Sequence, residues 1–276
     1  MNNLLLRSIT GLLFVVIVIS SFYFSITTCV TLILLIQIIA MFEFFKLVKL
    51  KYKSINIIKS SLANIFSFLL LISGYFIIRK IETILILSII PYLVLFMNEL
   101  YTKNKNPLTN MAITVFPLFL VSLPLFSMLL NSSEITNGIV KYNFHYSLSL
   151  FFIIWTNDTG AYITGITIGK NRLFERISPK KSWEGFFGGL VFSIAISYVL
   201  SLFFHDFEFW EWAIIATIVV ITGTYGDLFE SMIKRQLEVK DSGNILPGHG
   251  GILDRFDSIL FAAPFYYITI QLLLLI

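Results

Sequence analysis

The sequence predicts an all-α polytopic membrane protein with about nine transmembrane helices. Of its 276 residues, 57% are apolar and only 13% are charged, and the mean hydropathy is +0.86. Ordinary soluble domains contain roughly 45–50% apolar residues. Apolar runs of about 18–22 residues also recur along the chain, and this length lets a helix cross a hydrocarbon core about 30 Å thick. A soluble protein of this composition would expose large apolar patches.

The predicted spans follow one another with short connectors. We expect them at residues 8–23, 25–45, 61–78, 82–98, 111–130, 148–168, 186–204, 211–226 and 256–276. The first follows Arg7 but lacks a small-residue cleavage site, so an uncleaved helix is favoured over a signal peptide. Pro117 and Pro124 lie inside the fifth span and predict a kink. The single cysteine, Cys29, excludes an intrachain disulfide.

Lysine and arginine residues predict the orientation. With the N-terminus in the cytoplasm and the C-terminus outside, only Arg79, Lys80 and Lys141 of the 20 basic residues lie on the external side. Membrane proteins retain basic residues in their cytoplasmic loops. The segment 227–255 is therefore expected on the cytoplasmic side.

Charge divides the chain into two predicted regions, residues 1–147 with about five spans and residues 148–276 with a catalytic role. The first region is chemically quiet. Its most notable pair is Glu43 and Lys46, whose i,i+3 spacing predicts an ion pair at the membrane interface.

The second region opens with polar residues inside an apolar span. Asn157 and Asp158 interrupt the span at 148–168. A carboxylate at membrane depth is costly and indicates a functional site, although a structural polar contact between helices is the alternative. Ala161, Gly165 and Gly169 follow at four-residue spacing, which predicts the close approach of another helix.

The connector at 169–185 carries a second candidate feature. Lys180 and Lys181 precede Ser182, which is placed to cap the following helix. Lysines beside a helix N-terminus can bind phosphate. An ordinary basic cytoplasmic loop explains the same residues equally well on charge alone.

The stretch from Gly226 to Ser258 concentrates the remaining charge. If the eighth helix continues past its apolar part, Asp227, Glu230, Ser231 and Lys234 share one face. Asp254 and Asp257, at i,i+3, share a face at the start of the last span. Two facing helices with acidic ends predict a Mg²⁺ site, because Mg²⁺ takes oxygen ligands and usually adds substrate phosphate and water.

A glycine-rich loop lies between these helices. Gly248, Gly250 and Gly251 permit a backbone conformation whose N–H groups form an anion nest. His249 could be a metal ligand, an acid–base group or a phosphate hydrogen-bond donor. A lone histidine among oxygen ligands argues against zinc, so a donor or loop-shaping role is favoured.

The sequence SMIKRQLEVKDSGNILPGHGGILDRFD, at 231–257, resembles the phosphatidate cytidylyltransferases, the CDP-diacylglycerol synthases. GDLFES at 226–231, NDTGAY at 157–162 and SPKKSWEG at 178–185 are similar to the same family. The resemblance covers roughly residues 150–260. It implies transfer of CMP from CTP to phosphatidic acid in phospholipid biosynthesis, giving CDP-diacylglycerol and pyrophosphate.

The resemblance also implies roles for the charged residues. The expected metal ligands are Asp227, Asp254 and Asp257, which would hold Mg²⁺, and the family can use an additional monovalent cation such as K⁺. The expected catalytic residues are Asp227, Lys234, Arg235, Lys240, Asp241, Asp254 and Asp257. The expected substrate-binding residues are Asn157, Asp158, Lys180, Lys181, Ser231, His249, Gly250, Gly251 and Arg255.

The expected partners are CTP, phosphatidic acid and the lipid bilayer, with a homodimer as an open alternative and no nucleic acid. The expected location is the bacterial inner membrane, with the active site facing the cytoplasm. A related membrane kinase or cytidylyltransferase acting on an isoprenoid alcohol or archaeal-type lipid is the second enzyme hypothesis. A transporter is disfavoured because the polar residues cluster at the cytoplasmic helix ends rather than at midplane.

Overall fold

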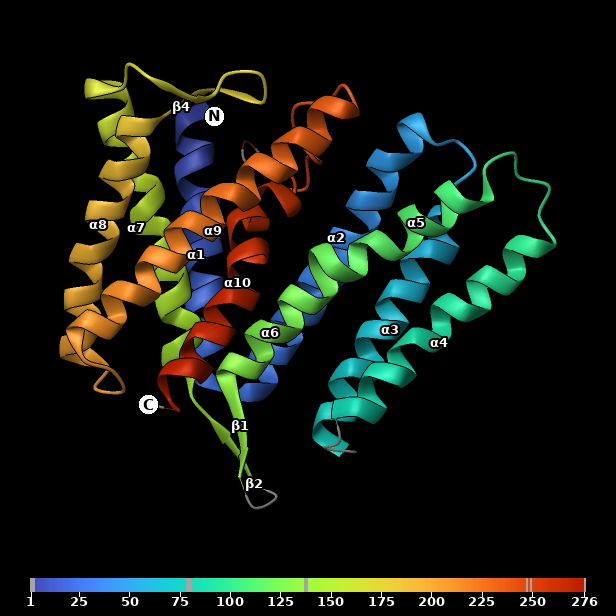
Figure 1. Cartoon of the computed structure of the whole chain (residues 1–276), viewed down its shortest axis with the longest axis horizontal. Helices are drawn as coiled ribbons and strands as arrows, with labels where there is room; N and C mark the ends of the chain where they lie inside the picture. The colour runs from blue at the N-terminus through green and yellow to red at the C-terminus, as the bar shows by residue number, and fades with distance from the viewer. Residues whose placement is uncertain (1–2, 78–80, 137–138, 247, 249, 276) are drawn as a thin grey trace.

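The computed structural model describes residues 3–77, 81–136, 139–246, 248 and 250–275. Long helices dominate it (Figure 1). They are α1 (Asn3–Phe24), α2 (Ile26–Lys51), α3 (Ile57–Ile77), α4 (Ile81–Leu100), α5 (Pro107–Pro117), α6 (Leu123–Ser132), α7 (Phe144–Ile168), α8 (Trp183–Phe203), α9 (Phe209–Gln236) and α10 (Leu253–Leu273).

The helical membrane class is confirmed. Each predicted span corresponds to a helical segment, although α9 continues to Gln236, ten residues past the predicted end at 226. Among the described residues, seven helices are long and apolar enough to cross a membrane, and α1 contributes a shorter apolar stretch, Ser8–Phe24. The expectation of nine spans and the orientation of the termini stay predictions.

The predicted fifth span is one helical segment with an irregular centre. A π-helical turn, η1 (Leu118–Ser122), separates α5 from α6. It lies between Pro117 and Pro124, neither of which has an amide hydrogen to donate to the preceding turn. Prolines and π-turns are common causes of a bend in a helix. The π-turn lies between the two prolines that predicted the kink, and the kink itself stays a prediction.

Two short hairpins were not predicted. β1 (Ser133–Thr136) pairs antiparallel with β2 (Ile139–Tyr142), and Ser133 lies opposite Tyr142. β3 (Arg172–Phe174) pairs antiparallel with β4 (Ser178–Ser182) inside the basic connector. Strands of three to five residues are too short to produce a clear alternating pattern in the sequence.

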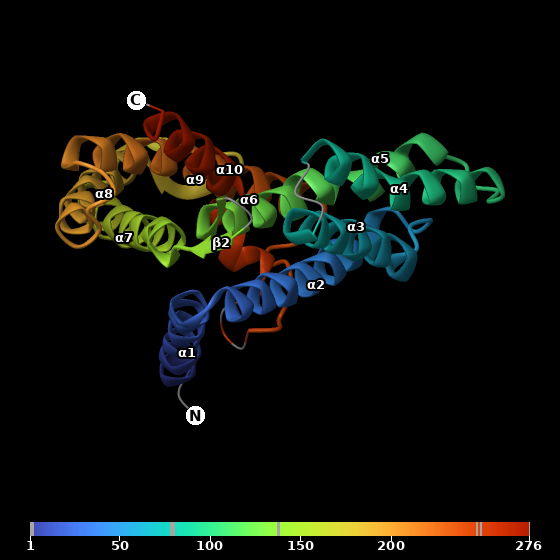
Figure 2. The ribbon, with the colours of Figure 1, turned by 90° about the horizontal axis from the view of Figure 1, so that it is seen from below.

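The helices form two groups joined through α6 and a shared core. Figure 2 shows α7 to α10 on one side and α3 to α5 on the other, with α6 between them and α2 running along one face. Phe22 of α1, Phe151 of α7, Trp212 of α9, and Phe256 and Tyr266 of α10 are fully buried in one core.

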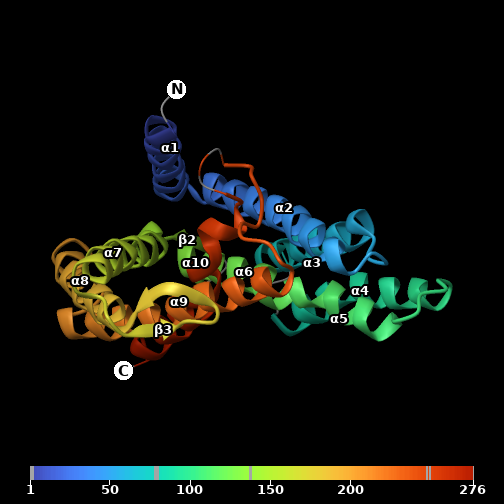
Figure 3. The same ribbon diagram turned by 90° about the horizontal axis from the view of Figure 1, so that it is seen from above.

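The connectors lie at two opposite ends of the bundle. Figure 1 shows the N-terminus, the β3–β4 hairpin and the α9–α10 loop at one end, and the C-terminus and the β1–β2 hairpin at the other. Viewed from above in Figure 3, the α9–α10 loop extends toward α2. This arrangement brings the charged connectors of the second region together at one end.

Candidate active site

Close packing of α7 against α8 sets the position of Asn157 and Asp158. A Cβ atom on Gly185 of α8 would lie 3.0 Å from the Ala161 carbonyl oxygen and 3.5 Å from the Gly165 Cα atom. These distances are tight for a side-chain carbon, so a small residue at this position favours the approach. The predicted packing role of the small residues on α7 is therefore confirmed.

The β3–β4 hairpin holds Lys180 and Lys181 over the same helices. Glu184, in the first turn of α8, accepts hydrogen bonds from the Asn171 side-chain nitrogen at 2.7 Å and from its backbone amide at 3.1 Å. The Ser182 hydroxyl caps α8 by accepting from the Gly185 amide at 3.1 Å. The predicted cap is confirmed, and together these contacts fix the end of β4 that carries the lysines.

These elements enclose a pocket of about 230 Å³. Asn157, Asp158, Lys180, Lys181 and Asp227 line it. The Lys181 ammonium lies 2.5 Å from the Asp227 carboxylate, and both side chains remain about 30% exposed (30% and 28%). We call Asp158, Lys180, Lys181 and Asp227 the open cluster. Three segments that are distant in the sequence thus meet at one cavity.

Arg255, at the start of α10, also belongs near this pocket. Its side chain is exposed, and its charge interacts electrostatically with that of Asp158 on α7. A basic group on a third helix is therefore close enough to Asp158 for their charges to interact.

The charged face of α9 forms as the helix continues to Gln236. The Ser231 hydroxyl donates to Asp227 at 3.2 Å, and the Lys234 ammonium donates to Glu230 at 2.8 Å. Both contacts have i,i+4 spacing. The predicted shared face is confirmed.

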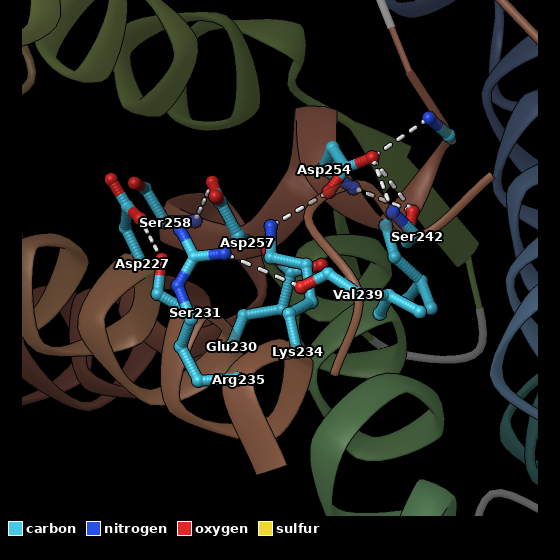
Figure 4. A network of polar contacts seen from close by, with 12 residues as sticks. Asp227, Glu230, Ser231, Lys234, Arg235, Val239, Ser242, Asp254, Asp257 and Ser258 are labelled. Carbon is cyan, nitrogen blue, oxygen red and sulfur yellow. Dashed lines mark hydrogen bonds and ion pairs between the residues drawn. The ribbon is translucent and has the colours of Figure 1, made fainter. Parts of the chain in front are cut away.

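Lys234 connects α9 to α10. Its ammonium also contacts Asp254 at 2.7 Å, and the two side chains are only 11% and 8% exposed. The other Asp254 oxygen accepts from the Ser242 amide at 2.8 Å, from the Ser242 hydroxyl at 3.0 Å and from the Gly251 amide at 2.8 Å (Figure 4). We call Glu230, Lys234, Ser242 and Asp254 the buried cluster. It ties the ends of the glycine-rich loop to both helices.

Asp257 lies between the two clusters. Its carboxylate accepts from the Ser258 amide at 2.6 Å and interacts electrostatically with Asp227 and Glu230 (Figure 4). One Glu230 oxygen is buried and has no hydrogen-bond partner among the described residues. This surplus of negative charge is chemically suited to a cation. Within the described part of the chain, however, no three His, Cys, Asp or Glu side chains stand ready to coordinate a metal.

Other predicted residues lie at the edge of the site. The Arg235 guanidinium donates to the Val239 carbonyl at 3.4 Å, while Lys240 and Asp241 are exposed. Gly250 has a φ of 85°, which favours glycine, and a Cβ atom there would lie 2.6 Å from the Asp254 carboxylate. His249 lies outside the described residues. The roles assigned to all of these residues stay predictions.

One residue of the first region was misinterpreted. Glu43 does not form the predicted interfacial pair, because its side chain is buried whereas Lys46 is exposed. Glu43 instead accepts hydrogen bonds from the Leu253 amide at 3.0 Å and the Ser242 hydroxyl at 3.4 Å. The signal that marked Asp158, a carboxylate within an apolar span, applied to Glu43 as well.

Comparison with known proteins agrees with the motifs. A model of the Cytidylyltransferase family matches residues 5–273, which is nearly the whole chain. The chain belongs to this family.

Individual relatives refine the comparison. The phosphatidate cytidylyltransferase of Staphylococcus haemolyticus is 51% identical over 122 residues, covering 44% of this chain and 46% of the relative. Those of Staphylococcus saprophyticus and Staphylococcus aureus are 50% and 49% identical over segments of similar size. The similarity thus spans about half the length of these relatives. The predicted resemblance to phosphatidate cytidylyltransferases is confirmed.

Proposed function

We propose that this protein transfers CMP from CTP to phosphatidic acid, giving CDP-diacylglycerol and pyrophosphate. Membership of the cytidylyltransferase family and the names of the similar proteins support the reaction class. The observation that carries the proposal is the pocket where Lys180, Lys181 and Asp158 meet Asp227 beside the buried cluster. Basic groups that can bind phosphate and carboxylates that can bind a metal adjoin there.

The reaction needs positioning and charge neutralisation more than a strong base. A phosphate monoester has a second pKa of about 6, so most of the phosphatidic acid headgroup is already dianionic at neutral pH. One of its oxygens attacks the α-phosphorus of CTP, and the bond from that phosphorus to the oxygen bridging the β-phosphate breaks. The electron pair leaves with pyrophosphate. The main barrier is the approach of two anions, which fixed positive charges lower.

Each group of residues has a proposed task in this reaction. Lys180, Lys181 and Arg255 bind the phosphates, with Lys181 exchanging its contact with Asp227 for a substrate oxygen. Asn157 and Asp158 line the same pocket and orient these basic groups or the substrate. Lys234 is held by two carboxylates, which supports a role in fixing Asp254. Further contacts of the substrates come from Ser231, Arg235, Lys240, Asp241, His249, Gly250 and Gly251.

A divalent cation, Mg²⁺, is part of the proposal, with K⁺ as an additional monovalent cation. Asp227, Asp254 and Asp257 would hold Mg²⁺, and the surplus of carboxylates around Asp257 supports this. When bound, the cation supplies charge neutralisation for the CTP phosphates. Asp227 and Asp254 instead contact lysines in this structure, so the proposed coordination requires each to give up its lysine contact. Asp254 can do this while its other oxygen keeps the Ser242 and Gly251 donors.

An apolar pocket supports a lateral approach for the lipid. It has a volume of about 240 Å³ and is lined by Phe119, Phe229, Leu260, Phe261 and Phe265, among others. A small neighbouring cavity shares Leu260 and Phe261 with it and is also lined by Glu230, Lys234 and Asp257. Acyl chains in this pocket would leave the phosphate beside the charged residues.

The same proposal includes a location and orientation. The protein would lie in the bacterial inner membrane with nine spans, the N-terminus and active site on the cytoplasmic side and the C-terminus outside. The gathering of the N-terminus, the β3–β4 hairpin and the α9–α10 loop at one end supports this arrangement. A homodimer stays a prediction.

The decisive experiment measures product formation by the purified protein in detergent with CTP, phosphatidic acid and Mg²⁺. We expect release of pyrophosphate and formation of CDP-diacylglycerol. A polyprenol in place of phosphatidic acid tests the second enzyme hypothesis, since a kinase would release CDP. Well-folded protein that forms no CDP-diacylglycerol would overturn the proposal.

A further inference from the structure

We infer that Glu43, in the first region of the chain, is a positioning residue for the glycine-rich loop of the proposed active site. This inference rests on the proposed function and extends it to α2. The role would be exerted through Ser242 and Leu253, which Glu43 contacts, and through them on Asp254. Glu43 itself would touch neither substrate.

The contacts of Glu43 join two ends of one loop. One carboxylate oxygen accepts from the Leu253 amide, at the first residue of α10, at 3.0 Å. The same oxygen lies 3.4 Å from the Ser242 hydroxyl, whose single proton is shared with Asp254 at 3.0 Å. Ser242 precedes the glycines of the loop and Leu253 begins α10, so the two contacts flank the glycine-rich loop. A single side chain of α2 thus holds both ends of the loop at a fixed separation.

The loop is also shaped around the Glu43 side chain. A Cβ atom on Gly243 would lie 2.6 Å from a Glu43 oxygen, and one on Gly251 would lie 2.7 Å from both oxygens. Such distances are far below van der Waals contact, so a side chain at either position would displace the Glu43 carboxylate and, at Gly251, also the Ser242 hydroxyl. The close fit requires that Glu43 and the loop adopt their positions together.

Asp254 depends on the same atoms. It accepts hydrogen bonds from the Ser242 amide, the Ser242 hydroxyl and the Gly251 amide. Each of these donors belongs to a residue that contacts or adjoins Glu43. Because the Glu43 side chain is only 5% exposed, its removal takes away the acceptor that the fold supplies to the buried Leu253 amide. Loss of Glu43 should therefore loosen the donors that orient Asp254.

The test compares Glu43→Ala with Glu99→Ala. Glu99 is a matched control, since its carboxylate also belongs to the first region and holds the α4–α5 connector through Asn104 and Asn110. We expect Glu43→Ala to lower kcat roughly 10–100-fold, with a smaller change in KM for CTP. Substitution of residues that orient the binding groups of a site commonly costs this much activity. Glu99→Ala should keep kcat within about twofold.

Hydrogen exchange supplies a readout independent of turnover. In Glu43→Ala the amides of Ser242, Gly251 and Leu253 should exchange at least tenfold faster, while those of α7 and α8 stay unchanged, because only the loop is released. Glu43→Gln keeps an acceptor for the Leu253 amide and should restore most of the lost kcat. The losses caused by Glu43→Ala and Ser242→Ala should be non-additive, because the two groups act through one contact.

Several outcomes would contradict the inference. Unchanged kcat and exchange in Glu43→Ala would overturn it, as would equal losses of activity and thermal stability in the two alanine variants. If Glu43→Ala does not fold, Glu43→Gln and Ser242→Ala carry the same test. Inactive wild-type protein would refute the proposed function alone, since the exchange comparison still tests whether Glu43 holds the loop.

Discussion

The open cluster and the buried cluster contain the same chemical groups in opposite environments. The side chains of Lys181 and Asp227 are 30% and 28% exposed and line a pocket. Those of Lys234 and Asp254 are only 11% and 8% exposed, and their polar atoms are hydrogen-bonded within the protein. Exposed ion pairs contribute little stability, while breaking a buried pair leaves an uncompensated charge. The comparison supports the proposal that Lys181 exchanges Asp227 for a substrate oxygen, whereas Lys234 joins α9 to α10.

The largest expected effect comes from breaking the buried cluster. Asp254→Ala should abolish turnover and also destabilise the protein by up to about 3–5 kcal/mol, because Lys234 loses a buried partner. Activity assays and thermal unfolding in detergent measure the two effects. Wild-type unfolding behaviour in this variant would contradict a structural role for the cluster.

Breaking the open cluster should separate activity from stability. Asp227→Asn is expected to abolish turnover while changing the free energy of unfolding by less than about 1 kcal/mol, the usual range for an exposed pair. The same two measurements apply. A loss of stability as large as that of Asp254→Ala would remove the distinction between the clusters.

Lys181→Ala should affect substrate binding more than it affects folding. Loss of one charge-assisted contact of about 1.5–3 kcal/mol corresponds to roughly tenfold or more in KM for CTP. Raising the salt concentration should weaken binding by the wild type more than binding by the variant, because exposed charges are screened. Lys181→Arg, which keeps the charge, is the matched control. An unchanged KM in Lys181→Ala would place the triphosphate elsewhere.

Glu184→Ala should have the smallest effect. Glu184 holds the β3–β4 hairpin through Asn171 but does not line the pocket of the open cluster. We expect a KM increase of less than roughly tenfold and little change in stability, since each hydrogen bond contributes about 1 kcal/mol. Greater mobility of Lys180 and Lys181, measured by spin labels in the hairpin, should accompany it. An effect as large as that of Lys181→Ala would give Glu184 a direct role.

Sequence reasoning was most successful where local spacing decides the structure. The i,i+4 contacts along α9 and the Ser182 cap of α8 depend on residues four or fewer positions apart. It was least successful for Glu43, whose contacts with Ser242 and Leu253 span 199 and 210 positions. The i,i+3 neighbour Lys46 suggested a local ion pair, but the helix presents the two side chains to different environments.

The sequence by itself determined the membrane class, the helical segments, the family and the residues that could carry the chemistry. Composition, hydrophobic length and motif spacing are sufficient for these conclusions because each is a local property of the chain. Only the tertiary structure decided that Lys181 meets Asp227, that Lys234 meets Asp254 and that α2 reaches the loop through Glu43. Those pairings depend on how helices pack, and packing is fixed by shape and burial across the whole molecule.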